Sequence, residues 1–152
     1  MITTIKKVMI FGTFDFFHAG HDFFIKEASK LGDQLIVVIS RDRTTKLVKG
    51  EFPDNNEKTR LKIIKKHPLV TKAILGDLQD KYAAIKKYRP EVIALGYDQY
   101  IFTQQIKPII IKNKISAEII RLNPYKPEMY KSSILKKQKN AEEDITKVCN
   151  LD

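Results

Sequence analysis

Short runs of β-branched and other apolar residues alternate along this chain with stretches of helical spacing, and this alternation constrains the fold most. Strands are expected at residues 5–11, 34–40, 72–75, 91–95 and 117–122. Helices are expected at residues 18–31, from about residue 54, and at residues 79–88, 101–113 and 132–147. Strands that alternate with helices are typical of a parallel sheet covered by helices on both faces. We therefore predict an α/β fold with a five-stranded parallel sheet.

Three segments of the chain are less regular. Residues 41–53 are polar and are expected to form a loop between the second strand and the second helix. Pro108 should shorten or kink the helix expected at residues 101–113, because proline lacks an N–H and clashes with the preceding turn. The end of the chain mixes charges without a clean apolar stripe. We therefore expect a folded domain at residues 1–137 and a charged helix or tail at residues 138–152.

The composition fits a folded protein in a reducing compartment. The 152 residues correspond to one domain, with 43% hydrophobic and 30% charged residues. No apolar run reaches the roughly 18–20 residues that a membrane helix needs, and the start of the chain lacks a signal-peptide pattern. The single cysteine, Cys149, cannot form a disulfide within the chain. We expect a cytoplasmic protein without a membrane partner.

The formal net charge of +10 raises the question of nucleic-acid binding. Lysines spread along the chain supply most of the excess, whereas arginine is the better fork for phosphates and base edges. The arginines are Arg41, Arg43, Arg60, Arg89 and Arg121. We expect the positive charge to attract small phosphorylated substrates rather than DNA or RNA.

Polar residues gather directly after several of the expected strands. These clusters lie at residues 12–21, 41–49 and 96–99, and a fourth at residues 130–133 lies beyond the last strand. In a parallel α/β sheet, ligands bind at the carboxyl ends of the strands. The four clusters therefore predict one ligand site at that edge of the sheet.

The first cluster, GTFDFFHAGH at residues 12–21, has the properties of a phosphate site. Gly12 and Gly20 allow close approach of a ligand to the backbone, and the helix N-terminus presents N–H groups to an anion. His18 and His21 lie on one side of that first turn, where imidazoles can stabilise charge that grows on a phosphate. The cluster has neither the Gly-Lys-Ser/Thr of a Walker loop nor a G-x-G-x-x-G fingerprint.

Two other interpretations of the histidine pair stay open. Zinc binding would need further ligands. The side chains available for this are those of Asp15, Asp22, His67 and Cys149. Alternatively, His18 and His21 could simply cap the helix.

The sequence GTFDFFHAGH resembles the signature of the cytidylyltransferase-like nucleotidyltransferases, and the resemblance extends to about residue 137. It implies a Rossmann-like, HUP-type fold. In that family the two histidines contact the phosphates of a nucleoside triphosphate and stabilise the departing pyrophosphate, so it implies catalytic roles for His18 and His21. It also implies a divalent cation, Mg²⁺, held through the phosphates rather than by side chains, and a homodimer.

The resemblance and the strand-end rule together predict the rest of the site. Lys46 is expected to be catalytic, because in the family a lysine of this segment reaches over the triphosphate. The expected nucleotide-binding residues are Gly12, Thr13, Phe14, Gly20, Gly96, Tyr97, Asp98, Ser132 and Ser133. The expected residues on the acceptor or phosphate side are Asp15, Lys49, Arg60 and Lys131. Alternatively, the lysines are merely solvated, Arg60 pairs with Glu57 along its helix, and Ser132 only caps a helix.

Two branches of the family compete. Residues 72–76 and 94–99 and the Arg41-Asp42 pair look like the archaeal-type FAD synthases, which transfer an adenylyl group from ATP to FMN. Glycerol-3-phosphate cytidylyltransferases carry an arginine and an aspartate that residues 67–72 lack, and a hydroxyl where this chain has Ile134. We favour the first branch and keep the second as the alternative. A non-catalytic nucleotide-binding module on the same fold is the alternative from another class.

Overall fold

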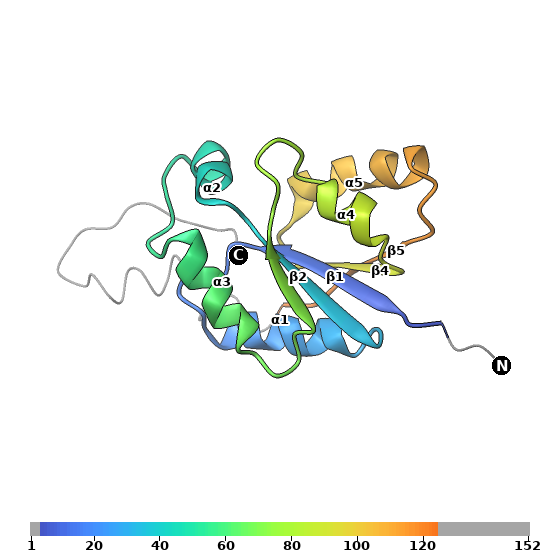
Figure 1. Cartoon of the computed structure of the whole chain (residues 1–152), viewed down its shortest axis with the longest axis horizontal. Coiled ribbons are helices and arrows are strands. Elements are labelled where there is room, and N and C mark those ends of the chain that lie inside the picture. The colour runs from blue at the N-terminus through green and yellow to red at the C-terminus, as the bar shows by residue number, and fades with distance from the viewer. Residues whose placement is uncertain (1–3, 125–152) are drawn as a thin grey trace.

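The computed structural model describes residues 4–124, which form five strands and five helices (Figure 1). The strands are β1 (Lys7–Gly12), β2 (Gln34–Ile39), β3 (Lys72–Leu75), β4 (Val92–Leu95) and β5 (Glu118–Arg121). The helices are α1 (Ala19–Ser29), α2 (Asp42–Lys49), α3 (Glu57–Lys65), α4 (Ala83–Tyr88) and α5 (Tyr100–Lys112). The alternation of strands and helices that the sequence predicts is confirmed.

The strands form one parallel sheet in the order β3-β2-β1-β4-β5. The chain runs outward from β1 through β2 to β3, and then returns to the other side of β1 to form β4 and β5. The reversal of direction lies between β1 and β4, and such a reversal opens a crevice at the carboxyl ends of the strands. The loop after β1 therefore lies at the edge of the sheet where a ligand binds in this class of fold.

Each face of the sheet has its own apolar core, because successive side chains of a strand point to opposite faces. Val8 and Ile10 of β1 pack with α1 and α3 residues such as Ile25 and Ile64. Met9 and Phe11 of the same strand belong to the second core, on the face that α4 and α5 cover. Figure 1 shows this arrangement, with α1 and α3 on one side of the sheet and α4 and α5 on the other.

The structure corrects the expected loop at residues 41–53. Residues Asp42–Lys49 form helix α2, and α3 begins at Glu57, where the side chain of Asn56 accepts the N–H of Thr59 and so caps the helix. Helix α2 buries only Thr45 and exposes its two apolar residues, Leu47 and Val48, so it has no apolar stripe against the core of the kind by which a surface helix is usually identified. Pro108 does not shorten α5, which continues to Lys112.

Several expectations lie outside the described residues, namely the helix at 132–147, the fourth polar cluster and the tail at 138–152. Within residues 4–124, the helices are all too short or too polar to cross a membrane.

Candidate active site

Hydrogen bonds join the carboxyl ends of the three central strands. The N–H of Ser40, after β2, donates to the carbonyl of Gly12 at the end of β1 (3.0 Å). On the other side of β1, the Gln99 side chain donates from Nε2 to the carbonyl of Phe11 (2.9 Å). The Oε1 atom of Gln99 accepts the N–H of Gly96 after β4 (2.7 Å). The three described clusters therefore meet at one edge, as the sequence predicts.

The loop between β1 and α1 has a strained backbone. Phe14 and Phe16 have φ angles of 54° and 51°, in the left-handed region that bulky side chains rarely adopt. Strain of this kind costs about 1–3 kcal/mol per residue and concentrates at functional sites. With this backbone conformation the side chain of Phe14 points into the protein. The residue is 1% exposed, and its ring lies edge-on to that of His21 at a centroid distance of 5.3 Å.

This turn gives Gly12 a packing role that the sequence analysis missed. A Cβ atom at Gly12 would lie 2.7 Å from Cε2 of Phe14, so the aromatic ring occupies the space that a side chain would need. We expect Gly12→Ala to lower the free energy of unfolding by about 1–3 kcal/mol, because the ring must shift within a packed core. Urea unfolding followed by circular dichroism measures this change.

Gly76→Ala is the matched control for that substitution. Its added Cβ would meet nothing closer than 3.6 Å, and its backbone is not left-handed. We expect its stability to stay within about 0.5 kcal/mol of the wild-type value. Equal stability of the two variants would show that the ring of Phe14 does not require glycine at position 12.

His18 and His21 are held by the first turn of α1. Nδ1 of His18 accepts the N–H of Gly20 (3.0 Å), and Nδ1 of His21 accepts the N–H of His18 (3.3 Å), which together form a capping box. The two rings stack at a centroid distance of 3.7 Å. The capping interpretation is therefore confirmed, and it is compatible with a phosphate-binding role.

Capping also sets the chemistry of the two rings. An imidazole whose Nδ1 accepts a hydrogen bond carries its ring proton on Nε2 and acts as a donor there. His21 is 3% exposed and its ring lies between those of Phe14 and Phe17, with centroid distances of 5.3 and 5.6 Å. The helix start thus holds two oriented N–H donors beside its own backbone amides, which suits an anion that gains charge.

His67, the third histidine, supports α1 from outside the pair. Its Nδ1 accepts the N–H of Leu69 (3.1 Å), and its Nε2 donates to Oδ1 of Asp22 (2.7 Å). Hydrogen bonds from the Lys26 ammonium and from His67 hold the pKa of Asp22 below its usual range. His67 therefore fastens the first turn of α1 to the loop before β3, a connection that the sequence analysis did not predict.

Arg60 lies entirely inside the protein, with 0% of its surface exposed. Nη2 donates to Oδ1 of Asp42 (2.6 Å), and Nη1 donates to the carbonyls of Thr13 and Ser40 (both 2.9 Å). Its Nε donates to the carbonyl of Asn55 (2.9 Å). The alternative pairing of Arg60 with Glu57 is wrong. The prediction that Arg60 faces the phosphates is corrected to a positioning role, because these bonds direct the guanidinium into the loops after β1 and β2.

Helices α2 and α3 are also joined at their first residues. The carboxylate of Asp42 accepts the N–H of Glu57 (3.1 Å), and that of Glu57 accepts the N–H of Asp42 (2.9 Å). Arg41 donates from Nε to Oε2 of Glu57 (2.9 Å). Carboxylates near helix N-termini are stabilised by the helix dipole. These bonds fix the direction of α2, although α2 itself buries little apolar surface.

Asp15 faces the protein in this structure. The side chain is 3% exposed, and its carboxylate accepts the N–H groups of Asp54 (2.8 Å) and Asn55 (3.1 Å) and the Asn55 amide (2.9 Å). The sequence analysis placed Asp15 on the acceptor or phosphate side. The structure shows that it ties the segment before α3 to the loop that carries the histidines.

Lys46 lies on α2 rather than in a loop. Its Nζ donates to the carbonyl of Gly50 (3.0 Å) and lies 5.5 Å from the centroid of the Phe52 ring. Lys49 is the last residue of the same helix. Both lysines therefore lie beyond the carboxyl end of β2, at the edge of the sheet that holds the histidines.

The cluster after β4 forms a turn. The carbonyl of Gly96 accepts the N–H of Gln99 (3.2 Å) and Nη1 of Arg121 (2.7 Å). Tyr97 and Asp98 are half-buried at the tip of the turn. Ser132, Ser133 and Lys131 lie outside the described residues. Gly96, Tyr97 and Asp98, which are expected to bind the nucleotide, thus lie on the β4 side of β1, while Lys46 and Lys49 lie on its β2 side.

Within residues 4–124, no group of three His, Cys, Asp or Glu side chains is arranged to hold a metal ion. This part of the chain gives the zinc interpretation no support.

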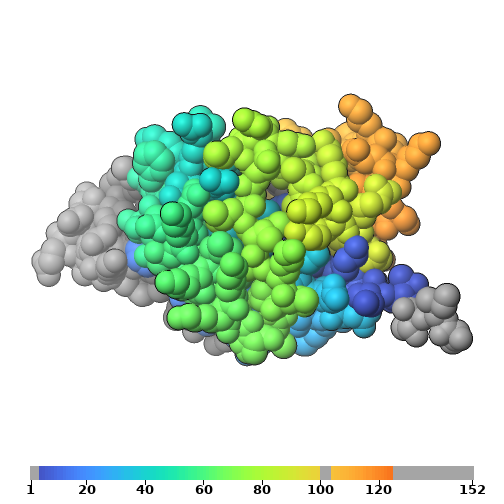
Figure 2. Space-filling view, in the orientation of Figure 1, coloured from blue at the N-terminus to red at the C-terminus, as the bar shows by residue number. Residues whose placement is uncertain are grey.

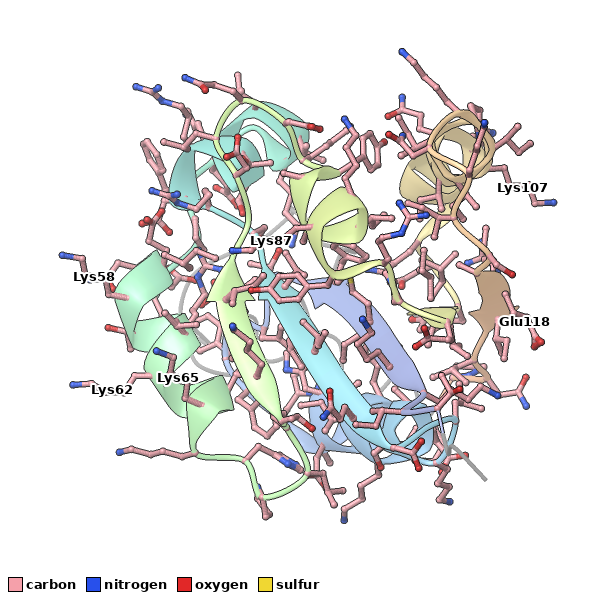
Figure 3. The ribbon with its side chains drawn as sticks, turned by 45° about the vertical axis from the view of Figure 1, so that its right-hand side comes forward. Lys58, Lys62, Lys65, Lys87, Lys107 and Glu118 are labelled. Carbon is pink, nitrogen blue, oxygen red and sulfur yellow. The ribbon has the colours of Figure 1, made fainter. Side chains whose placement is uncertain are left out.

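Among the described residues, lysines gather on the outer face of α3. Lys58, Lys62 and Lys65 are exposed at helical spacing on α3 and project away from the sheet (Figure 3). They make none of the contacts that organise the histidine loop. A face of this kind contributes to the field that attracts anionic substrates.

Comparisons with known proteins identify the family. A model of the cytidylyltransferase-like family matches residues 9–139. The chain belongs to this family. Family relatives include the FAD synthase of Thermoplasma volcanium, 36% identical over 132 residues, which are 87% of this chain and 92% of the relative. The FAD synthase of Ferroglobus placidus is 40% identical over 118 residues, covering 78% of this chain and 76% of the relative.

Solved structures agree with this membership. A protein from Thermoplasma volcanium, described as a lipopolysaccharide core biosynthesis protein, matches with a TM-score of 0.75 and 37% identity. The match covers 80% of this chain and 99% of that chain. A pantoate-beta-alanine ligase from Francisella tularensis, 15% identical, matches with a TM-score of 0.58 over 95% of this chain and 74% of its own, and shares the fold alone.

Proposed function

We propose that this protein transfers the adenylyl group of ATP to FMN and forms FAD and pyrophosphate. The observation that carries the proposal is the pair of imidazoles fixed at the start of α1, with Nδ1 of each ring engaged by the backbone. The similarity to FAD synthases over 76–92% of the length of two relatives supports the choice of reaction.

In the reaction, a phosphate oxygen of FMN attacks the α-phosphorus of ATP. The bond from the α-phosphorus to the bridging oxygen breaks, and pyrophosphate leaves with the electron pair. Such a displacement needs no covalent enzyme intermediate, so catalysis consists of positioning and charge stabilisation. His18 and His21 donate from Nε2 to the phosphates that become pyrophosphate, together with the amides of the first turn of α1.

Other groups bind and orient the two substrates. The turn of Gly96, Tyr97 and Asp98 receives the base and ribose of ATP, and Lys46 and Lys49 neutralise phosphate charge on the β2 side. Mg²⁺ enters with ATP and supplies further neutralisation of the phosphates. The resemblance to the family supports a homodimer located in the cytoplasm, with small molecules as its substrates.

The test is a matrix of ATP and CTP against FMN and glycerol 3-phosphate, with Mg²⁺ present and pyrophosphate release as the readout. We expect release only with ATP and FMN, with FAD identified by mass spectrometry. Release only with CTP and glycerol 3-phosphate would replace the proposal by the cytidylyltransferase alternative. Retention of ATP without any pyrophosphate release would assign a nucleotide-binding module instead.

A further inference from the structure

The topology leaves one side of the site for the acceptor. β1 carries the histidine loop, and its two neighbours in the sheet are β2 and β4. The function proposed above assigns the turn after β4 to the base and ribose of ATP. In-line attack requires the acceptor oxygen to lie opposite the leaving pyrophosphate, and the flank of β1 that is not assigned to the base and ribose is the one where β2 leads into α2. Figure 2 shows α2 and the segment that follows it (teal) at the rim of the molecule.

That flank carries the largest concentration of exposed apolar side chains among the described residues. Leu47, Val48 and Phe52 are 79%, 59% and 61% exposed, and they fall within six consecutive positions. The described exposed large hydrophobic residues elsewhere are single side chains on separate segments, such as Ile111 on α5. Scattered apolar residues need no explanation, whereas a grouped set beside a site indicates a binding surface.

Phe52 combines an apolar ring with a nearby positive charge. The Lys46 ammonium lies 5.5 Å from the centroid of the ring, a cation–π distance. With 61% of the residue exposed, much of the ring still faces solvent. An acceptor with a planar aromatic system and an anionic phosphate matches both properties. Glycerol 3-phosphate offers only the anion.

The segment that holds Phe52 is anchored to the histidine loop. The N–H of Asp54 donates to Oδ2 of Asp15 (2.8 Å), and Phe52 precedes Asp54 by two residues, which is at most about 7.6 Å between Cα atoms. Asp15 in turn precedes His18 by three residues. The bonds between Asp42 and Glu57 hold the same end of the segment, where it enters α3. Phe52 is therefore kept close to the histidine loop, where the function proposed above places the phosphates, as a ring on the same small molecule requires.

We propose that Phe52, with Lys46 and Leu47 on the preceding helix, forms the surface on which the isoalloxazine ring of FMN stacks. This assignment rests on the function proposed above. It gives the protein a reason to prefer a flavin over a small aliphatic phosphate, because only the flavin gains the stacking contact. Stacking of a heteroaromatic base on a side chain changes affinity by about 5- to 100-fold.

The test measures FMN binding by the fluorescence anisotropy of the flavin itself, in the presence of the non-transferable analogue α,β-methylene ATP. We expect Phe52→Ala to raise the Kd for FMN about tenfold or more, and Phe52→Tyr to restore binding close to the wild-type value. The KM for FMN should rise in Phe52→Ala while the KM for ATP stays unchanged. Ile111→Ala, which also removes an exposed apolar side chain but on α5, should leave the Kd unchanged.

The outcomes separate the two proposals. Wild-type protein that binds no FMN would overturn both. If the wild-type protein forms FAD and Phe52→Ala binds FMN with the wild-type Kd, only the proposed stacking surface is overturned. Light scattering compares the oligomeric states of the wild-type protein and Phe52→Ala. A smaller oligomer of Phe52→Ala with an unchanged Kd for FMN would overturn the stacking surface and assign the exposed segment to a contact between copies of the chain. Thermal unfolding of each variant checks that the fold is retained.

Discussion

Replacing His18 with asparagine is expected to lower kcat for pyrophosphate release by about 10²–10³-fold with little change in stability. Asparagine is a good N-cap and can still accept a helix N–H, but it does not place a ring N–H where Nε2 of His18 donates. The loss of one preorganised donor to a developing phosphate charge costs about that factor. His21→Gln should show a loss of similar size, because the second donor is also removed. Steady-state kinetics with ATP and FMN measure both effects.

His67→Gln is the matched control, because it changes a histidine that supports α1 without belonging to the stacked pair. It should reduce stability more than it reduces kcat. Near-normal turnover by His18→Asn or His21→Gln, with the fold verified by circular dichroism, would contradict the catalytic assignment and leave the pair with its capping role alone.

Arg60→Met is expected to be the most destabilising of the substitutions considered, by about 3–5 kcal/mol. Methionine fills part of the space but removes the partner of Asp42 and the donors to the carbonyls of Thr13, Ser40 and Asn55. An acceptor that stays buried without a partner costs more than the hydrogen bond contributed. Because these contacts fix the loops after β1 and β2, activity should fall as well. Urea unfolding gives the free energy directly.

Arg43→Met tests whether loss of any arginine from this region has the same effect. Arg43 is exposed on α2, so its replacement should change the free energy of unfolding by no more than about 0.5 kcal/mol. The free energy of unfolding of Arg60→Lys should lie between those of Arg60→Met and Arg43→Met, because an ammonium keeps the charge but loses the planar fork. Stability of Arg60→Met within about 1 kcal/mol of wild type would refute the buried network as a major contributor.

Much of the site was predictable because parallel strands share a direction. Polar residues after β1, β2 and β4 must come together at one edge of such a sheet, and they do. The partners of individual side chains were not predictable. Arg60 was expected to face phosphates or pair with Glu57. It instead bonds to the carbonyl of nearby Asn55 and to three groups from distant segments, namely the Asp42 carboxylate and the carbonyls of Thr13 and Ser40. Such long-range pairs leave no periodic trace in the chain.

Helix α2 likewise could not be predicted from the sequence, in this case at the level of secondary structure. Its first five residues are polar, its two apolar residues, Leu47 and Val48, are exposed, and it buries only Thr45, so it has no apolar stripe that packs on the core. Short helices are marginal without tertiary support. The reciprocal bonds between the first residues of α2 and α3 supply that support, and the direction of α2 places Lys46 beside Phe52.

By itself, the sequence determined the order of the five strands and of the described helices apart from α2, the parallel sheet and the position of the histidine pair at a helix start. These features depend on local periodicity and on spacing within a few residues. Only the tertiary structure decided that Phe14 folds back onto Gly12, that Asp15 and Arg60 face inward, and that Phe52 faces outward near the site. The physical reason is that burial and hydrogen-bond partners are settled by segments that meet only when the whole sheet has formed.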